Sequence, residues 1–328
     1  MIISVAICTF NGEKYLGQQL DSILSQSTPV DQIVICDDKS TDKTKLILEK
    51  YKTKYPEIIN IFKNKNQLRS NKNFEKALSL CTGDYIFFAD QDDIWQPDKV
   101  SKTIAFFLEN TKIQGVFSNA DLINEDNSLF SNEITLWDCS GFFQSEFIEP
   151  INLIMFMIIE GNFVTGATLC IKKDVKQLCL PFQTNEKNFY HDHWIAFLLA
   201  EKNTLGYINE NLVSYRIHIN QQIGIGNHAE RIKSFNNYTK AYKMILGFFK
   251  PTNFNEYKLI TRFFYDKYIH HKNNYNKDYS QIINYKIEVN LLKLFKKAKI
   301  NMIKAYPLKY ITKKIAYLFK KDNSLTFK

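Results

Sequence analysis

The stretch IISVAICTFNGEKYLGQQLDSILSQS (residues 2–27), followed by QIVICDD (residues 32–38), decides the fold class. Its first β-branched run ends at the turn signal Asn11-Gly12, a pattern typical of a buried strand. Apolar residues then recur at helical spacing up to residue 26, and the next apolar run indicates a second strand. A strand, a helix and a strand in this order predict a parallel pair joined by a crossover helix.

The same alternation continues to residue 121. We expect further helices over residues 40–55, 71–81 and 97–110, and further strands over residues 58–62, 85–89 and 115–121. The sequence therefore predicts an α/β fold, with a mostly parallel sheet and helices on both faces. The pattern then weakens, with a loop over residues 124–145, strands over 163–171 and 212–217, and a helix over 192–200.

Charge separates two regions of the 328-residue chain. Residues 229–328 hold 22 lysines and arginines against 6 acidic residues, whereas residues 1–228 hold 21 against 28. We therefore expect one domain over residues 1–228 and a basic helical region over residues 229–328. The lysines of residues 291–321 alternate with apolar side chains, which suits either an anionic membrane surface or a solvated helical cap. Nucleic acid is a poorer partner, because the first region is acidic and lacks a nucleic-acid motif.

The sequence also indicates in which cellular compartment the protein is expected. The first residues lack the basic start and long apolar run of a signal peptide, and the apolar segment 151–159 is too short to span a bilayer. The six cysteines show no metal or disulfide spacing, which fits a reducing compartment. We therefore expect a cytoplasmic protein without a membrane span.

An acidic turn, Asp90-Gln91-Asp92-Asp93, directly follows the strand over residues 85–89. Three carboxylates this close repel one another, which is costly without a cation. Hard cations such as Mg²⁺ or Mn²⁺ take one or two carboxylates together with substrate phosphates. The turn indicates either a metal–diphosphate site or a solvated turn that caps the helix beginning at Pro97.

Polar residues also end the first two strands. Thr9 and Asn11 follow the first strand, and Asp37-Asp38 follow the second. Ligands of parallel sheets bind beyond the carboxyl ends of the strands, so we expect these groups at one edge with the acidic turn. Asp37 and Asp38 could accept hydrogen bonds from a nucleobase or ribose, or could cap the next helix.

Taken together, residues 3–27, QIVICDDKSTDKT (32–44) and GDYIFFADQDDIWQPDKV (83–100) resemble the N-terminal half of family 2 glycosyltransferases of GT-A fold. The motifs follow the family's order and spacing, strongly over residues 1–122 and more weakly to about residue 228. The resemblance implies a Rossmann-like sheet, a nucleotide-binding half over 1–122 and an acceptor-binding half over 123–228. The stretches 87–97 and 215–224 are most similar to bacterial rhamnosyltransferases of surface-polysaccharide synthesis.

The resemblance implies a role for each matching residue. The nucleotide would be bordered by Thr9, Asn11, Glu13, Asp37, Asp38, Arg69 and Asp90. Asp90 and Asp92 would form the DxD motif that binds Mn²⁺ or Mg²⁺, with Asp92 the direct ligand and His218 a further one. The sugar or acceptor would meet Asp93, Trp95 and His191, with core packing as an equal alternative for Trp95.

The resemblance also implies a general base at the start of a helix in the second half, and Asp192 matches it. A helix N-terminus stabilises a carboxylate, and the flanking His191 and His193 are expected to help keep it charged. A plain N-cap role is the alternative for Asp192, and Glu160 and Glu186 are the competing bases.

These roles imply an inverting, metal-dependent glycosyltransferase. It would move a sugar, with rhamnose as a candidate, from a nucleoside-diphosphate sugar to a saccharide acceptor, expected to be lipid-linked, in cell-surface polysaccharide synthesis. The basic tail would hold it on the inner face of the plasma membrane. The alternative is a non-catalytic sugar-nucleotide-binding protein of the same fold, which would not need Asp192.

Overall fold

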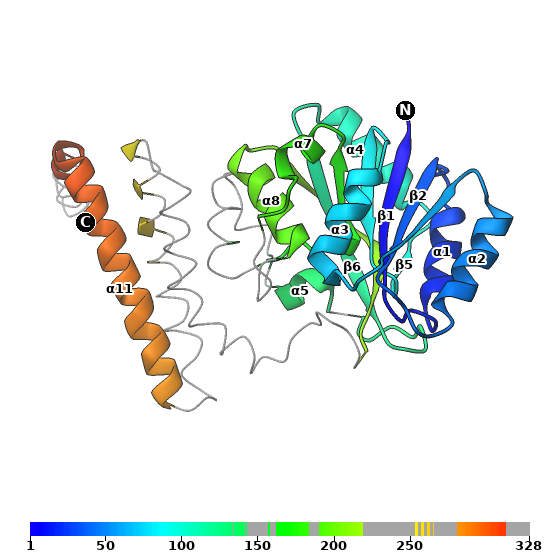
Figure 1. Cartoon of the computed structure of the whole chain (residues 1–328). Helices are drawn as coiled ribbons and strands as arrows, with labels where there is room; N and C mark the ends of the chain where they lie inside the picture. Colours follow the sequence, from blue (N-terminus) through cyan, green and yellow to red (C-terminus); the bar gives the residue numbers. More distant parts are fainter. Residues whose placement is uncertain are drawn as a thin grey trace. The chain divides into compact units, whose positions relative to one another are not determined.

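The computed structural model describes residues 1–132, 134–140, 142, 157, 162–183, 190–218 and 281–312, with seven further residues between 253 and 265. The chain forms two compact units, Met1–Asn227 and His228–Lys328, and each is described by itself (Figure 1).

An eight-stranded sheet in the order β3-β2-β1-β4-β7-β6-β8-β5 runs through the first unit (Figure 1). Its parallel half consists of β1 (Ile3–Thr9), β2 (Gln32–Asp37), β3 (Ile59–Lys63) and β4 (Tyr85–Ala89). The other half consists of β5 (Ile94–Trp95), β6 (Gly115–Ile123), β7 (Leu169–Lys172) and β8 (Leu205–Arg216). There β7 runs antiparallel to β4 and β6, β5 runs antiparallel to β8, and β6 runs parallel to β8.

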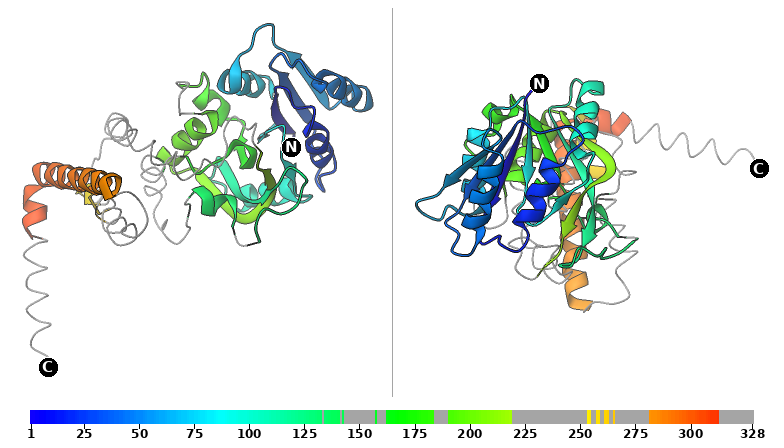
Figure 2. Two further views of the ribbon diagram at one scale, coloured as in Figure 1. Left: turned by 90° about the horizontal axis from the view of Figure 1, so that it is seen from below. Right: turned by 90° about the vertical axis from the view of Figure 1, so that its right-hand side faces the viewer.

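Helices cover both faces of this sheet, as predicted. They are α1 (Leu16–Leu24), α2 (Thr44–Lys54), α3 (Arg69–Leu80), α4 (Lys99–Glu109), α5 (Leu136–Ser140), α7 (Val175–Cys179) and α8 (His191–Glu201). Figures 1 and 2 show α1 and α2, in blue, on one side of the sheet, and α3 and α8 on the other.

The alternation of side chains along β1 explains this division. Val5 and Ile7 belong to one buried cluster with Leu16 and Leu20 of α1, because every second residue of a strand faces the same side. On the opposite face, α3 packs on β1 and β2. Both faces of β1 are thus buried, as expected for the centre of a parallel sheet.

The carboxyl ends of three neighbouring strands lie level with one another. In the register of the sheet, Thr9 lies opposite Asp37, and Ile7 lies opposite Ala89. The loops after β1, β2 and β4 therefore emerge at the same edge, where the parallel-sheet rule places a ligand.

Several elements differ from the sequence predictions. The strand expected over residues 212–217 begins earlier, because β8 comprises Leu205–Arg216. Residues 163–171 do not form one strand, because the N–H of Thr168 donates to the carbonyl of Thr165 (2.9 Å) and closes the 3₁₀ turn η2 (Gly166–Thr168) before β7. The strand β5 was not predicted, because two residues are too few to show an alternation of apolar and polar side chains. Part of the expected loop over 124–145 forms α5, which packs on β6, while residues 133, 141 and 143–145 lie outside the described residues.

The C-terminal unit contains α11 (Gln281–Ala305). Ala298 and Met302, one helical turn apart, are buried, whereas Lys293, Lys296 and Lys297 are exposed. This part of the helix is therefore amphipathic. Among the described residues, no helix combines the length and the apolar character needed to cross a bilayer.

Candidate active site

The acidic turn between β4 and β5 is fastened to the end of β1. The side chain of Gln91 accepts a hydrogen bond from the N–H of Phe10 (2.9 Å) and donates one to its carbonyl (3.0 Å). A side chain at Gly12 would collide with Gln91, which explains the glycine there. The turn does not cap α4, because the cap position of that helix is Asp98.

Two predicted metal ligands meet beside this turn. The Nε2 atom of His218 lies 2.9 Å from Oδ2 of Asp92, although the two residues are 126 positions apart. The ring of Tyr15 lies 5.2 Å from the imidazole of His218. The segment after β8 thus brings an imidazole to the acidic turn.

Arg216 joins the acidic turn to neighbouring loops. The fully buried guanidinium donates to the backbone carbonyls of Asp92 (2.7 Å) and Asn124 (2.9 Å) and to the side chain of Gln18 (3.0 Å). Its centre lies 4.4 Å from the ring centre of Tyr15. The sequence analysis did not indicate this bracing role of Arg216.

Asp93 and Trp95, the expected sugar or acceptor contacts, are both buried. Asp93 is fully buried and accepts a hydrogen bond from the N–H of Arg216 (2.9 Å). Burial and repulsion by Asp92 and Asp90 raise the pKa of Asp93. Trp95 is 2% exposed and packs against Phe87, with ring centres 5.5 Å apart. Both side chains lie in the core and not on the open edge. For Trp95, this is the core-packing role that the sequence left open as an alternative.

Asp192 lies in the first turn of α8. It accepts hydrogen bonds from the N–H groups of Gly166 (2.9 Å) and His193 (2.6 Å). The cap position is Tyr190, so Asp192 is not the N-cap. Burial raises the pKa of Asp192 to about 6, against the lowering effect of the two N–H donors.

The charge of Asp192 affects the pKa of a carboxyl group in the acidic turn. Burial and repulsion by Asp92 and Asp192 raise the pKa of Asp90 to about 8. The expected base and the expected metal-binding turn therefore belong to one site. The competing bases Glu160 and Glu186 lie outside the described residues.

The two histidines beside Asp192 cannot supply positive charge, which corrects the expectation from sequence. Burial lowers the pKa of His191 to about 3 and that of His193 to about 4, so both are neutral at pH 7. His191 stacks on Phe74 with ring centres 3.9 Å apart. Neither of its ring nitrogens has a hydrogen-bond partner among the described residues. His191 thus lies in a buried aromatic stack.

Asp37 and Asp38 brace loops at the predicted nucleotide edge. Asp37 accepts hydrogen bonds from the hydroxyls of Thr9 (3.0 Å) and Ser40 (2.5 Å). Asp38 accepts them from the N–H groups of Leu68 (2.7 Å) and Arg69 (2.8 Å). Neither carboxylate caps α2, whose cap position is Lys43. Through these hydrogen bonds, the two carboxylates fix the conformation of the loops at this edge.

Asn11 and Glu13 lie in the loop after β1, and Arg69 is the first residue of α3, which follows β3. The side chains of Asn11 and Glu13 accept hydrogen bonds from the N–H groups of Thr41 (2.9 Å) and Lys43 (2.8 Å). Asn11 and Arg69 have φ values of 49° and 63°, a left-handed conformation that a non-glycine residue adopts only when its surroundings enforce it. The loops at the strand ends are therefore tied to one another.

The residues at the acidic turn fit a divalent cation that shares its coordination with a substrate. Among the described residues, no group of three or more His, Cys, Asp or Glu side chains could enclose a metal ion. Asp92 and His218 offer a carboxylate oxygen and an imidazole nitrogen side by side. Mg²⁺ sites of this kind use one or two carboxylates plus substrate phosphates and not a complete protein cage.

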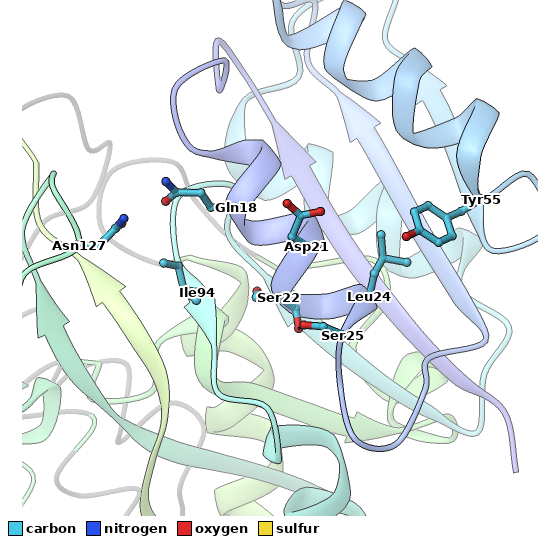
Figure 3. Close-up of a pocket in the computed structure, with 8 residues that line it drawn as sticks. All are labelled: Gln18, Asp21, Ser22, Leu24, Ser25, Tyr55, Ile94 and Asn127. Carbon is cyan, nitrogen blue, oxygen red and sulfur yellow. The ribbon is translucent and has the colours of Figure 1, made fainter.

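A separate hollow of about 560 Å³ lies on the exposed side of α1 (Figure 3). Its lining residues are Gln18, Asp21, Ser22, Leu24, Ser25, Tyr55, Ile94 and Asn127. None of the predicted site residues lines it, so the candidate active site remains the edge at the strand ends.

The doubly wound sheet with an acidic turn at its carboxyl edge defines a nucleotide-binding α/β enzyme class, and comparisons with known proteins specify it. The model of Glycosyl transferase family 2 matches residues 4–178, more than half of the chain. This chain belongs to that family, and it is a glycosyltransferase.

Two curated proteins illustrate the relationship. The dTDP-rhamnosyl transferase RfbG of Shigella flexneri is 32% identical over 229 residues, which cover 66% of this chain and 73% of RfbG. An uncharacterised glycosyltransferase of Nostoc sp. is 27% identical over 231 residues, covering 70% and 67% of the two chains.

Solved structures share the GT-A fold. TarS of S. aureus, residues 1–349 in complex with UDP-GlcNAc, gives a TM-score of 0.51 at 17% identity, covering 90% of this chain and 72% of TarS. The mannosyltransferase PcManGT of Pyrobaculum calidifontis, in complex with GDP-Man and Mn²⁺, gives a TM-score of 0.52 at 14% identity, covering 96% and 79%. Both likenesses concern the fold.

Proposed function

We propose that this family 2 enzyme is an inverting, metal-dependent glycosyltransferase that moves a sugar from a nucleoside diphosphate to a saccharide acceptor. The observation that carries the proposal is the pairing of Asp92 with His218, 2.9 Å apart, at the carboxyl edge of the sheet, because a carboxylate and an imidazole side by side suit a cation that binds the donor diphosphate. One site then holds a base for the acceptor and an acidic turn for the donor. A protein that only bound sugar nucleotides would not need a buried carboxylate facing the turn.

The chemistry follows from the surroundings of Asp192. With a pKa of about 6, most of its carboxylate is ionised at pH 7 and can accept the proton of an acceptor hydroxyl. The hydroxyl oxygen forms its bond to the anomeric carbon as the bond to the diphosphate oxygen breaks, on the opposite face of the sugar. The transition state resembles an oxocarbenium ion, as in other glycosyl transfers.

Asp92 and His218 are the residues that would hold the divalent cation, with Asp90 beside them. A bound cation would offset the negative charge on the departing diphosphate. The Mn²⁺ named with PcManGT supports Mn²⁺ as the first ion to test, with Mg²⁺ as the alternative.

The name of RfbG supports dTDP-rhamnose as the first donor to test. We also propose cell-surface polysaccharide synthesis as the process. A thermal-shift screen of nucleotide sugars with Mn²⁺ identifies the donor, because a ligand that binds the folded state raises the unfolding temperature. We further propose a lipid-linked acceptor and a cytoplasmic location on the inner face of the plasma membrane. The lysines exposed on α11 support that location, because anionic lipids attract them.

The substitution Asp192→Asn tests the role of the base. We expect kcat to fall by about 10²- to 10⁴-fold, the usual contribution of a general base, with the donor dissociation constant unchanged. Asp174→Asn, at an exposed aspartate before α7, is the matched control and should keep full activity. Normal turnover by Asp192→Asn would show that the base lies elsewhere.

A further inference from the structure

A buried lysine lies behind the candidate base. Lys99, the first residue of α4, is 1% exposed, and its Nζ donates to the backbone carbonyl of Ala167 at 2.9 Å. The same Nζ lies 4.8 Å from the centre of the Trp95 ring. Burial lowers the pKa of Lys99 to about 7. Because burying an amine is costly, its two defined contacts indicate a specific role.

The carbonyl that Lys99 holds belongs to the turn that also contacts the base. Ala167 is the middle residue of η2, and the N–H of Gly166 in the same turn donates to Asp192 at 2.9 Å. The turn is closed by the hydrogen bond from Thr168 to Thr165. The contacts to Lys99 and Asp192 therefore come from adjacent residues of one short, closed element.

The turn η2 packs closely against the residues around the base Asp192. A Cβ atom at Gly166 would lie 2.9 Å from Nε2 of His191 and 3.7 Å from Oδ2 of Asp192. The backbone of the turn thus packs directly on the start of α8. Any shift of the turn changes the distance between the N–H of Gly166 and the carboxylate of Asp192.

We propose that Lys99 is a positioning residue for the base: by holding the carbonyl of Ala167, it keeps the N–H of Gly166 on the carboxylate of Asp192. This inference rests on the proposed function, in which Asp192 accepts the acceptor proton. Lys99 does not touch the substrate in this role. It acts through the turn, since a base that is held in place loses less rate to misorientation.

The test compares Lys99→Met with Val100→Ala in the full-length protein. Methionine keeps an unbranched side chain but removes the N–H donors and the charge. Val100 is fully buried in the same helix, so its truncation loosens α4 without removing the hydrogen bond from Lys99 to Ala167. Hydrogen exchange of the Gly166 amide measures its bond to Asp192, and kinetics measure kcat and the donor KM.

For Lys99→Met we expect the Gly166 amide to exchange at least about 10-fold faster, because its opening costs less free energy. We expect kcat to fall at least about 10-fold and the donor KM to stay within about 2-fold, the signature of a lost transition-state interaction. Val100→Ala should leave the exchange rate of the Gly166 amide, kcat and the donor KM unchanged. Lys99→Gln, which restores a shorter N–H donor, should lie between the wild type and Lys99→Met, and it replaces the methionine variant if that one does not fold.

The two readouts separate this inference from the proposed function. Unchanged exchange of the Gly166 amide in the Lys99 variant would overturn the positioning role, whatever the activity. An equal loss of kcat in Val100→Ala would also overturn it, because general loosening of α4 would then explain the effect. Normal turnover by Asp192→Asn would instead overturn the base assignment and leave the exchange result standing.

Discussion

Asp192 shows how opposing effects on one side chain produce a base that works near neutral pH. Burial favours the protonated carboxyl, while the N–H groups of Gly166 and His193 favour the carboxylate. The balance leaves the pKa at about 6. An exposed aspartate would be ionised over a wider pH range but would be a weaker base.

The pH dependence of the reaction follows from this balance. Because only the carboxylate can accept a proton, we expect kcat/KM to rise tenfold per pH unit below about pH 6 and to level off above it. Initial rates between pH 5 and 8 at fixed cation concentration measure this rise of kcat/KM with pH. A rate that does not change over that range would contradict the assignment.

The buried His191 predicts a loss of stability in acid. Its pKa is about 3 in the folded protein and about 6.5 when exposed, so between these values only the unfolded chain binds the proton. The stabilisation is complete above pH 6.5 and falls by about 1.4 kcal/mol per pH unit below it.

Urea unfolding of the wild type and His191→Leu at pH 7, 6 and 5 measures this contribution. The difference in unfolding free energy between the two proteins should shrink as the pH falls, because leucine binds no proton. Carboxyl groups with raised pKa values contribute equally to both proteins and cancel. A difference that stays constant with pH would contradict the prediction.

Among the elements, the turn between β4 and β5 receives interactions from several distant parts of the chain. Gln91 ties it to β1, and Arg216 ties it to the end of β8. His218 reaches Asp92 from the segment beyond β8. The turn is therefore held from two sides before any ligand arrives, which reduces the cost of binding.

Asp92→Ala tests the role of this turn in donor binding. We expect calorimetry to show that Mn²⁺ no longer strengthens donor binding, because the carboxylate beside His218 is lost. Asp98→Ala, at the half-buried cap position of α4, is the control and should retain the Mn²⁺ effect. Donor affinity that still depends on Mn²⁺ in Asp92→Ala would remove Asp92 from the metal site.

Over the whole molecule, charge differs between the two parts of the chain. Residues 1–228 carry an excess of acidic groups, whereas residues 229–328 carry 22 basic groups against 6 acidic ones. A basic segment next to an acidic domain can bind an anionic surface without drawing the domain itself to that surface.

Liposome flotation tests this difference. We expect the full chain to float with vesicles that contain anionic lipid and to be released by high salt, because each lysine near the surface contributes about 1 kcal/mol and salt screens it. Deletion of residues 291–328 should abolish flotation, and neutral vesicles are the control. Flotation of the truncated chain would show that the membrane contact lies elsewhere.

Sequence alone determined the family, the alternation of strands and helices up to residue 121, and the polar edge. These features are readable because they depend on local periodicity and on the rule that parallel strands end at a common edge. Thr9, Asp37 and Asp90 could be placed there without any knowledge of tertiary contacts.

Only the tertiary structure decided which polar side chains face that edge. Asp93 and His191 carry the residue types of a binding site, yet both are buried and contact partners far away in the chain, Arg216 and Phe74. Asp93 is held by the backbone of Arg216, 123 residues away, and Lys99 reaches Ala167 across 68 residues. Burial of this kind depends on packing between distant segments, and no local pattern in the sequence records that packing.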